Sequence, residues 1–104
     1  MMDIKKALSM IGLSKKAGRL ISGVPMVCDA LRDGKVCLVV YASHASENSV
    51  KRVRDKANTY KTVALPLDTT PEELGHWVGK TGAVSAVGIT DNGFAEAIKK
   101  IISD

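Results

Sequence analysis

Apolar residues recur along much of the chain at the spacing of one helix face. From Ile4 to Ile11 an apolar residue returns every three or four positions, after a capping residue at Asp3 and before a terminating glycine at Gly18. Comparable patterns, each with its own start and stop signals, predict further helices over residues 22–34, 46–60, 70–79 and from 91 to the C-terminal end.

Four shorter stretches between these helices are predicted to be strands, at residues 19–21, 36–42, 62–67 and 83–90. Residues 36–42 are apolar without interruption, which is typical of a central strand covered on both faces. Pro66 lacks an N–H, so the end of the third stretch is expected to be an edge or a bend. The alternation predicts one α/β domain over residues 1–104, a three-layer α/β/α sandwich around a central mixed sheet of about four strands.

Polar residues in front of three helices predict how those helices begin. Ser22 is expected to cap the second helix, which makes Pro25 its third residue, inside the first turn where a missing N–H costs little. Ser46 is expected to cap the third helix. Thr70 and Glu73 have the spacing of a capping box at the start of the fourth.

The charge and composition narrow the classes of partner. The net charge of +4 and a pI of about 9.2 favour polyanions, because each phosphate contact by Lys or Arg releases counterions. Only 4% of the residues are aromatic, which argues against a stacking platform for single-stranded bases. No apolar run approaches the roughly 18 residues of a membrane span, and no signal peptide is expected. No membrane partner is therefore predicted. Cys28 and Cys37 form no CxxC pair and lie in apolar runs, which predicts buried thiols and a cytoplasmic location.

The sequence GKTG at residues 79–82 is the strongest enzyme-like motif. A phosphate-binding loop needs a glycine five positions before the GK pair, but that position is Leu74, and Gly75 is one residue too close. The predicted order is also wrong, because GKTG leaves a helix and enters a strand, whereas phosphate binding uses a helix N-terminus. Gly79 as a helix terminator accounts for the motif better.

Histidines offer no clear catalytic or metal site. His44 lies beside Ser43 in a turn, and His76 follows Glu72 and Glu73 on a helix, where a solvated histidine is the commoner outcome. The two His and two Cys are scattered over four predicted elements, so no metal set emerges. We therefore predict no catalytic residues, no metal and no cofactor, and a protein that is not an enzyme.

Two groups of basic residues have different interpretations. The helix over residues 47–60 carries Lys51, Arg52, Arg54 and Lys56 on a face that must be polar in any case, so a solvated face is favoured. The other group lies at predicted ends of elements, which are expected to gather on one rim and could contact phosphates. Its members are Lys15, Lys16, Arg19 and Lys80.

Several segments together resemble the ribosomal protein L-seven-Ae family, most closely its small stand-alone bacterial members. These segments are LSMIGLSKKAGRLISG, DALRDGKVCLVVYASHASEN, EELGHWVGK and AVGITDNGFAEAI, and they cover nearly the whole chain. The resemblance implies an α/β/α sandwich and the binding of kink-turn RNA, a sharply bent helix–internal-loop–helix with tandem sheared G·A pairs. It also implies that recognition centres on the turn into the second helix, with a G-x-N-E-x-x-K pattern, and on the loop after the LG-containing helix.

This chain matches only part of that pattern. The family glycine corresponds to Gly23, but Pro25, Met26 and Asp29 replace its Asn, Glu and Lys. The second loop corresponds to residues 80–83. Each replaced side chain removes a polar contact worth about 1–3 kcal/mol if the binding mode is otherwise unchanged.

The sequence thus predicts a non-catalytic, ribosome-associated protein that binds structured, kink-turn-like RNA. Its partners would be structured RNA, including ribosomal RNA, and a ribosomal or other protein. The predicted RNA-binding residues are Lys16, Arg19, Ser22, Gly23, Val24, Pro25, Met26, Lys80 and Thr81. The alternative is a protein-interaction module of the same fold that has lost kink-turn recognition. A small nucleotide-using enzyme is the third and weakest interpretation.

Overall fold

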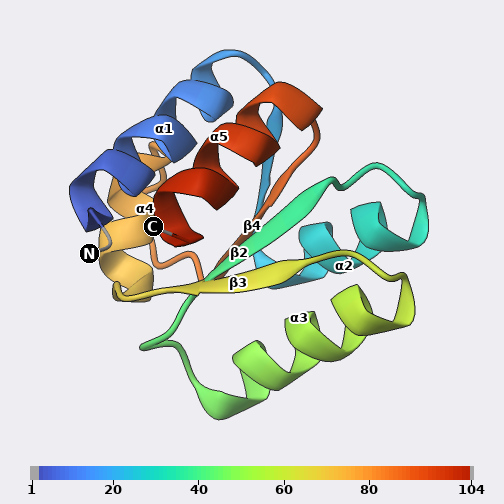
Figure 1. Cartoon of the computed structure of the whole chain (residues 1–104). Coiled ribbons are helices and arrows are strands. Elements are labelled where there is room, and N and C mark those ends of the chain that lie inside the picture. The colour runs from blue at the N-terminus through green and yellow to red at the C-terminus, as the bar shows by residue number, and fades with distance from the viewer. Residues whose placement is uncertain (1–2, 104) are drawn as a thin grey trace.

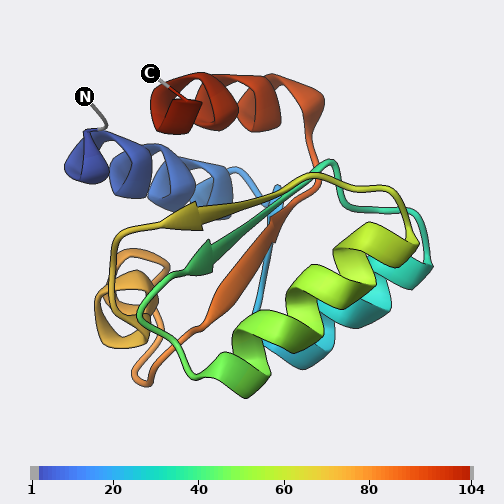
Figure 2. The same cartoon turned by 60° about the horizontal axis from the view of Figure 1, so that its bottom comes forward.

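The chain folds into three layers, with helices on both faces of a central sheet (Figure 1). The computed structural model describes residues 3–103. In chain order the elements are α1 (Ile4–Lys16), β1 (Leu20–Ser22), α2 (Val24–Arg32), β2 (Leu38–Ala42), α3 (Glu47–Thr59), β3 (Ala64–Leu67), α4 (Pro71–Trp77), β4 (Ala86–Ile89) and α5 (Asn92–Ser103). Figure 2 shows α1, α4 and α5 on one side of the sheet and α2 and α3 on the other. The predicted α/β/α sandwich is confirmed, and most strands are shorter than predicted.

The sheet is mixed, as predicted, and its four strands lie in the order β1-β4-β2-β3. Strand β4 is antiparallel to both of its neighbours, whereas β2 and β3 are parallel. Strands β1, β2 and β3 therefore finish at the same end of the sheet, and β4 starts there. Ser22 pairs with Val87 at this end, and Tyr41 with Ala86. We call it the α2 end of the sheet, because α2 begins there directly after β1.

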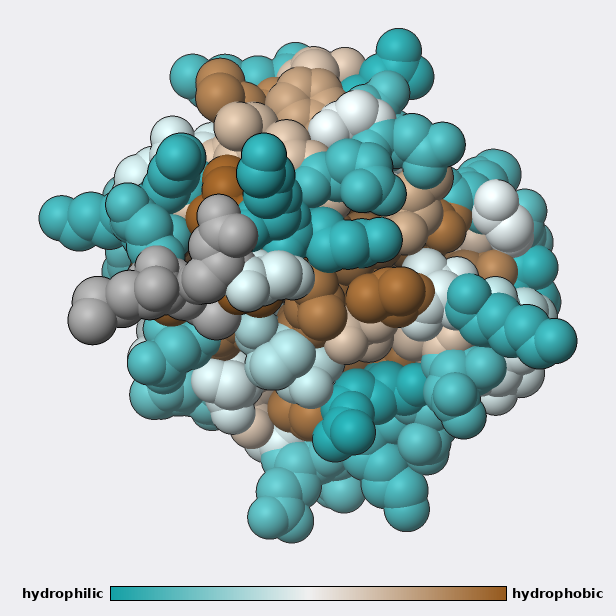
Figure 3. Space-filling model, in the orientation of Figure 1, coloured by the Kyte–Doolittle hydropathy of each residue, from teal (hydrophilic) through white to brown (hydrophobic). Residues whose placement is uncertain are grey.

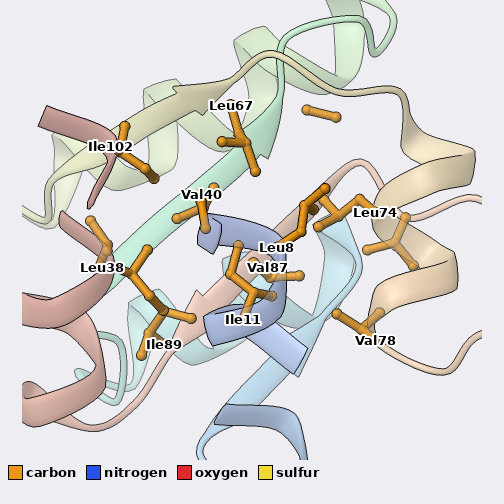
Figure 4. Close-up of a cluster of buried hydrophobic side chains, with 14 of the residues drawn as sticks. Leu8, Ile11, Leu38, Val40, Leu67, Leu74, Val78, Val87, Ile89 and Ile102 are labelled. Carbon is orange, nitrogen blue, oxygen red and sulfur yellow. The ribbon is translucent and has the colours of Figure 1, made fainter. Parts of the chain in front are cut away.

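Two apolar clusters hold the layers together, one on each face of the sheet. Strand β2 is buried along its whole length and serves both, because successive side chains point to opposite faces. Leu38 and Val40 belong to the cluster under α1, α4 and α5, which Figure 4 shows in close-up. Val39 and Tyr41 belong to the cluster under α2 and α3. The uninterrupted apolar run thus forms a central strand covered on both faces, as the sequence predicts.

Side-chain caps fix the starts of several helices. The amide of Ser49 donates to Ser46 Oγ at 3.2 Å, and the amide of Glu73 donates to Thr70 Oγ1 at 3.1 Å, so both predicted caps are confirmed. In a capping box the Glu73 carboxylate would accept from the Thr70 amide. Here it accepts instead from Trp77 Nε1 at 2.9 Å. Within residues 3–103, no helix has the length and apolar character that crossing a bilayer requires.

The start of α2 differs from the prediction. Ser22 does not cap the helix, because it is the last residue of β1 and its backbone is paired with β4. Gly23 is the N-cap instead, and Pro25 is the second helical residue rather than the third. The chain leaves the strand at Gly23 because its backbone has φ 95° and ψ 140°, a conformation that is almost restricted to glycine.

Strand β3 lies at an edge of the sheet, one of the two outcomes that Pro66 predicts. The carbonyl oxygens of Val63 and Leu67 accept hydrogen bonds from the amides of Val39 and Ser43. Odd-numbered residues of this segment therefore direct their backbone groups toward β2, and even-numbered residues direct theirs away from the sheet. Pro66 occupies one of these outward positions and has no N–H to offer another chain. This edge is therefore protected against pairing with a further strand.

Candidate nucleic-acid interface

Gly23 gives α2 an open start. Its amide donates to the carbonyl oxygen of Ala86 at 2.9 Å, and its own carbonyl accepts from the amide of Val27 at 2.9 Å. A Cβ atom at Gly23 would meet no other atom within 4 Å. Glycine is thus required here by the backbone conformation and not by lack of space, and the backbone is accessible from outside.

The first turn of α2 presents unused amides. No side chain caps the helix, and Pro25 has no N–H. Among the hydrogen bonds between residues 3–103, none uses the amide of Val24 or Met26 as donor. Two amides without an acceptor thus lie at the positive end of the helix dipole, an arrangement that favours anions.

The residues at the start of α2 differ in how far they are exposed to a ligand. Met26 has 60% of its surface exposed, and Pro25 is exposed beside it. Val24 is only 8% exposed as a whole residue, and its side chain packs into the core under α2 and α3. Ser22 is half-buried in β1. The turn thus combines a polar backbone with a small apolar patch.

A shallow hollow of about 400 Å³ lies beside this turn, and three segments form it. Besides the start of α2, they are the first half of α3 and the loop between α4 and β4. We call this the α2 hollow. Its lining residues are Gly23, Val24, Pro25, Asn48, Ser49, Arg52, Ala83, Val84 and Ser85.

The loop between α4 and β4 is held in place by close backbone contacts. Gly79 ends α4 with φ 73°, and the Lys80 amide donates to the carbonyl oxygen of Gly75 at 2.9 Å. A Cβ atom at Gly75 would lie 2.1 Å from the carbonyl oxygen of Gly82, so the loop packs directly on α4. Lys80 and Thr81 are exposed and lie just before the part of the loop that lines the α2 hollow.

Lys16 and Arg19 lie elsewhere. The carbonyl oxygen of Arg19 accepts from the amide of Thr90 at 3.0 Å, which places Arg19 where β4 ends, whereas Gly23 lies where β4 begins. Four extended residues put the two Cα atoms about 13 Å apart. The predicted single rim of basic residues is therefore wrong for Arg19, because β1 separates it from the α2 end of the sheet. Lys16, in the last turn of α1, precedes it and is also exposed.

The contribution of α3 to the α2 hollow is not among the sequence predictions. Arg52 is predicted to be part of a solvated face, and Asn48 and Ser49 have no predicted role, yet all three line the hollow. Their spacing of three and four residues puts them on one side of α3 and is the signal that could have grouped them. Among residues 3–103, no carboxylate lies within 4.0 Å of the Arg52 guanidinium or the Lys80 ammonium.

Carboxylates near the site have partners of their own. Asp29, which stands at the family's lysine position, lies 3.9 Å from Arg32 Nη1, and both side chains are more than 60% exposed. His44 Nε2 lies 2.6 Å from Asp68 Oδ1 and joins the turns that follow β2 and β3. His44 thus pairs with Asp68 and not with the neighbouring Ser43.

A second and larger groove, of about 800 Å³, runs along α3 on the side of β3. It contains none of the predicted RNA-binding residues. Its charged lining mixes Glu47 and Asp55 with Lys51 and Arg54, which gives no net preference for an anion. The α2 hollow is therefore the better candidate for phosphate contact, although it is smaller.

Comparison with known proteins identifies relatives over almost the full length. The chain is 38% identical over 98 residues to a protein of Enterococcus faecium called RNA-binding protein YlxQ, covering 94% of this chain and 92% of the relative. It is 32% identical over 93 residues to the protein of that name from Bacillus subtilis, covering 89% and 91%.

Solved structures have the same fold. A Bacillus halodurans protein described as having unknown function superposes with a TM-score of 0.86 at 29% identity, covering 95% of this chain and 98% of that one. The Giardia lamblia 15.5kD RNA binding protein superposes with a TM-score of 0.76 at 12% identity, covering 96% and 85%, which supports the fold alone. The sequence model of one family matches residues 5–99. On this match and on the relatives above, the chain belongs to the ribosomal protein L7Ae/L30e/S12e/Gadd45 family.

Proposed function

We propose that this chain is a non-catalytic RNA-binding protein whose binding surface is centred on the start of α2. The observation that carries the proposal is the open first turn of α2, where Gly23 exposes the backbone and the amides of Val24 and Met26 have no partner among residues 3–103. Relatives that carry the name RNA-binding protein support the choice of ligand. A net charge of +4 supports it further.

In the proposed binding mode, backbone groups take the place of the family's reading side chains. The amides of Val24 and Met26 donate to RNA phosphate or sugar oxygens, and the absence of a Cβ atom at Gly23 allows the RNA backbone to approach. Lys80 is exposed just before the part of the α4–β4 loop that lines the α2 hollow and is free to contact phosphates. Lys16 and Arg19 would contact phosphates farther along a structured RNA.

The proposed RNA is structured and kink-turn-like, as in a ribosomal RNA, and it is recognised through its bent shape. Pro25 and Met26 cannot hydrogen-bond base edges through their side chains, and Asp29 would repel a nearby phosphate. Because these positions no longer read bases, the discrimination of about 1–3 kcal/mol for each base contact is reduced. The proposal therefore includes weaker sequence preference than the family pattern implies.

No catalytic role is proposed for this chain. His44 is paired with Asp68, and both side chains are more than half exposed, so the pair lies in high-dielectric surroundings.

Free thiols at Cys28, which is buried, and Cys37, which is half-buried, support a reducing compartment such as the cytoplasm.

A second function has one specific observation in its favour. Met26 and Pro25 form an exposed apolar patch at the same turn, and exposed apolar surface often marks protein contacts. A protein partner, on or off the ribosome, is therefore the alternative occupant of this surface.

Titration of a kink-turn RNA and of an unbent duplex of equal length, each at two salt concentrations, separates the two functions. The proposal predicts tighter binding to the kink-turn. Equal weak affinities for the two RNAs would refute kink-turn recognition. If neither RNA binds at low salt, RNA binding itself is refuted and the protein-interaction function is favoured.

Two matched variants test the phosphate contacts. Lys80→Gln should reduce the magnitude of the log–log salt slope by roughly 0.7–0.9, which corresponds to one phosphate contact. Lys100→Gln removes the same charge from an exposed position on α5, on the opposite face of the sheet from α2, and should leave the slope unchanged. Equal effects of the two substitutions would mean that only the overall charge matters.

A further inference from the structure

Helix α3 has two exposed sides with different surroundings. Its buried residues, Val53 and Ala57, define its inner face. One side turns toward α2, which runs beside α3 (Figure 2). This α2-facing side carries Asn48, Ser49 and Arg52, which line the α2 hollow, and Lys56, which lies one turn beyond Arg52. The β3-facing side carries Glu47, Lys51, Arg54 and Asp55, which line the larger groove.

The two sides carry different charge. The α2-facing side has two cations, Arg52 and Lys56, and no carboxylate. The β3-facing side has two cations and two carboxylates, so its formal charges cancel. The α2-facing side is thus the more positive of the two exposed sides. The surface of α3 toward the viewer, at the lower margin of Figure 3, is mainly hydrophilic.

The basic residues of the α2-facing side are available to a ligand. Arg52 and Lys56 are both exposed, and no carboxylate among residues 3–103 lies within 4.0 Å of either. The carboxylates of the neighbouring helix are already close to a cation, because Asp29 and Asp33 lie 3.9 Å and 3.6 Å from Arg32. Lys56 also stabilises the helix C-terminus through the dipole, but this explanation does not apply to Arg52, which lies in the middle of α3.

We propose that the α2-facing side of α3 is a second phosphate-contacting surface, which extends the interface from the α2 hollow along the helix. RNA that leaves the hollow would pass over Arg52 and then Lys56, which lie about 6 Å apart along the helix axis. The ligand class is the sugar-phosphate backbone of a duplex next to the recognised element. This inference rests on the proposed function, because it needs RNA at the α2 hollow, and it adds a contact surface that the start of α2 does not include.

The chain offers a control with the same charge on the same helix. Arg52→Gln with Lys56→Gln, and Lys51→Gln with Arg54→Gln, each remove two positive charges and change the net charge from +4 to +2. All four residues are exposed. Glutamine keeps a high helix propensity, so both double variants should fold, and circular dichroism checks this. Any difference between them then reflects which side of α3 meets the RNA.

The measurement is the salt dependence of affinity for a kink-turn RNA with a long flanking stem. Loss of Arg52 and Lys56 should reduce the magnitude of the log–log slope by roughly 1.4–1.8, which corresponds to two phosphate contacts. Loss of Lys51 and Arg54 should leave the slope unchanged. Equal reductions in both double variants, or none in the Arg52 and Lys56 variant, would overturn the inference while the proposed function stands.

An RNA-length comparison provides an independent readout. Lengthening the flanking stem should increase the affinity of the wild-type chain and have no effect on the variant that lacks Arg52 and Lys56. An equal gain in both proteins would refute the second surface. If the wild-type chain binds neither RNA at low salt, the proposed function fails, and this inference fails with it.

Discussion

Replacing Gly23 with alanine tests the backbone conformation on which the start of α2 depends. The residue has φ 95° and ψ 140°, and a Cβ atom there would meet nothing within 4 Å, so the variant suffers conformational strain without a steric clash. A non-glycine residue in such a region costs about 1–3 kcal/mol, and alanine recovers about 0.4–1 kcal/mol by restricting the unfolded chain. We therefore expect a net loss of about 1–2 kcal/mol in the free energy of unfolding.

Urea denaturation followed by circular dichroism measures this loss, which corresponds to a midpoint lower by roughly 0.5–1 M. Gly82→Ala is the matched control, because Gly82 is also open to its surroundings but does not have a left-handed backbone. It should be neutral or stabilising by up to about 1 kcal/mol. If Gly23→Ala is as stable as Gly82→Ala, the account of Gly23 as a conformational requirement is refuted.

Three further substitutions test other parts of the structure. Gly75→Ala should destabilise by about 1–3 kcal/mol in urea, because its Cβ would lie 2.1 Å from the carbonyl oxygen of Gly82; an unchanged midpoint would contradict the close packing of the loop. Ser46→Ala should cost about 1 kcal/mol, a fall of roughly 4–8 °C in Tm, and an unchanged Tm would show that the cap on α3 contributes nothing. His44→Gln should change the free energy of unfolding by less than about 1 kcal/mol, because its pair with Asp68 is exposed, and a loss of several kcal/mol would reveal a structural role.

The parts of the fold that follow from local signals could be predicted from sequence. The apolar run of β2 predicts a central strand, and Ser46 and Thr70 predict helix starts, because each signal acts within a few residues. Pro66 predicts an edge or a bend for an equally local reason, the absence of its N–H, and the structure has an edge strand there.

The start of α2 could not be placed correctly, because it depends on a distant strand. Ser22 has the chemistry of a cap, but pairing with Val87 keeps it in β1, and the helix begins one residue later. The separation of Arg19 from Gly23 depends on β4 in the same way. Strand β4 runs antiparallel to β1, so Gly23 lies beside its start and Arg19 beside its end.

The sequence points to the place of the candidate site better than to the residues that line it. The family resemblance points to the turn at Gly23 and to the loss of polar side chains at Pro25 and Met26. It does not indicate that Arg52 borders the same hollow, because this requires the rotation of α3 relative to α2. That rotation is a property of the packed layers and has no local signature in the sequence.

Backbone amide resonances recorded during titration with a kink-turn RNA test the central claim most directly. If RNA binds at the start of α2, the largest chemical-shift changes are expected at Gly23, Val24 and Met26, with further changes in residues 80–85 and along the α2-facing side of α3. The amides in the middle of α5, on the opposite face of the sheet, should change little. Binding that leaves Gly23, Val24 and Met26 unaffected would contradict the account, because the open start of α2 would then not be where the RNA binds.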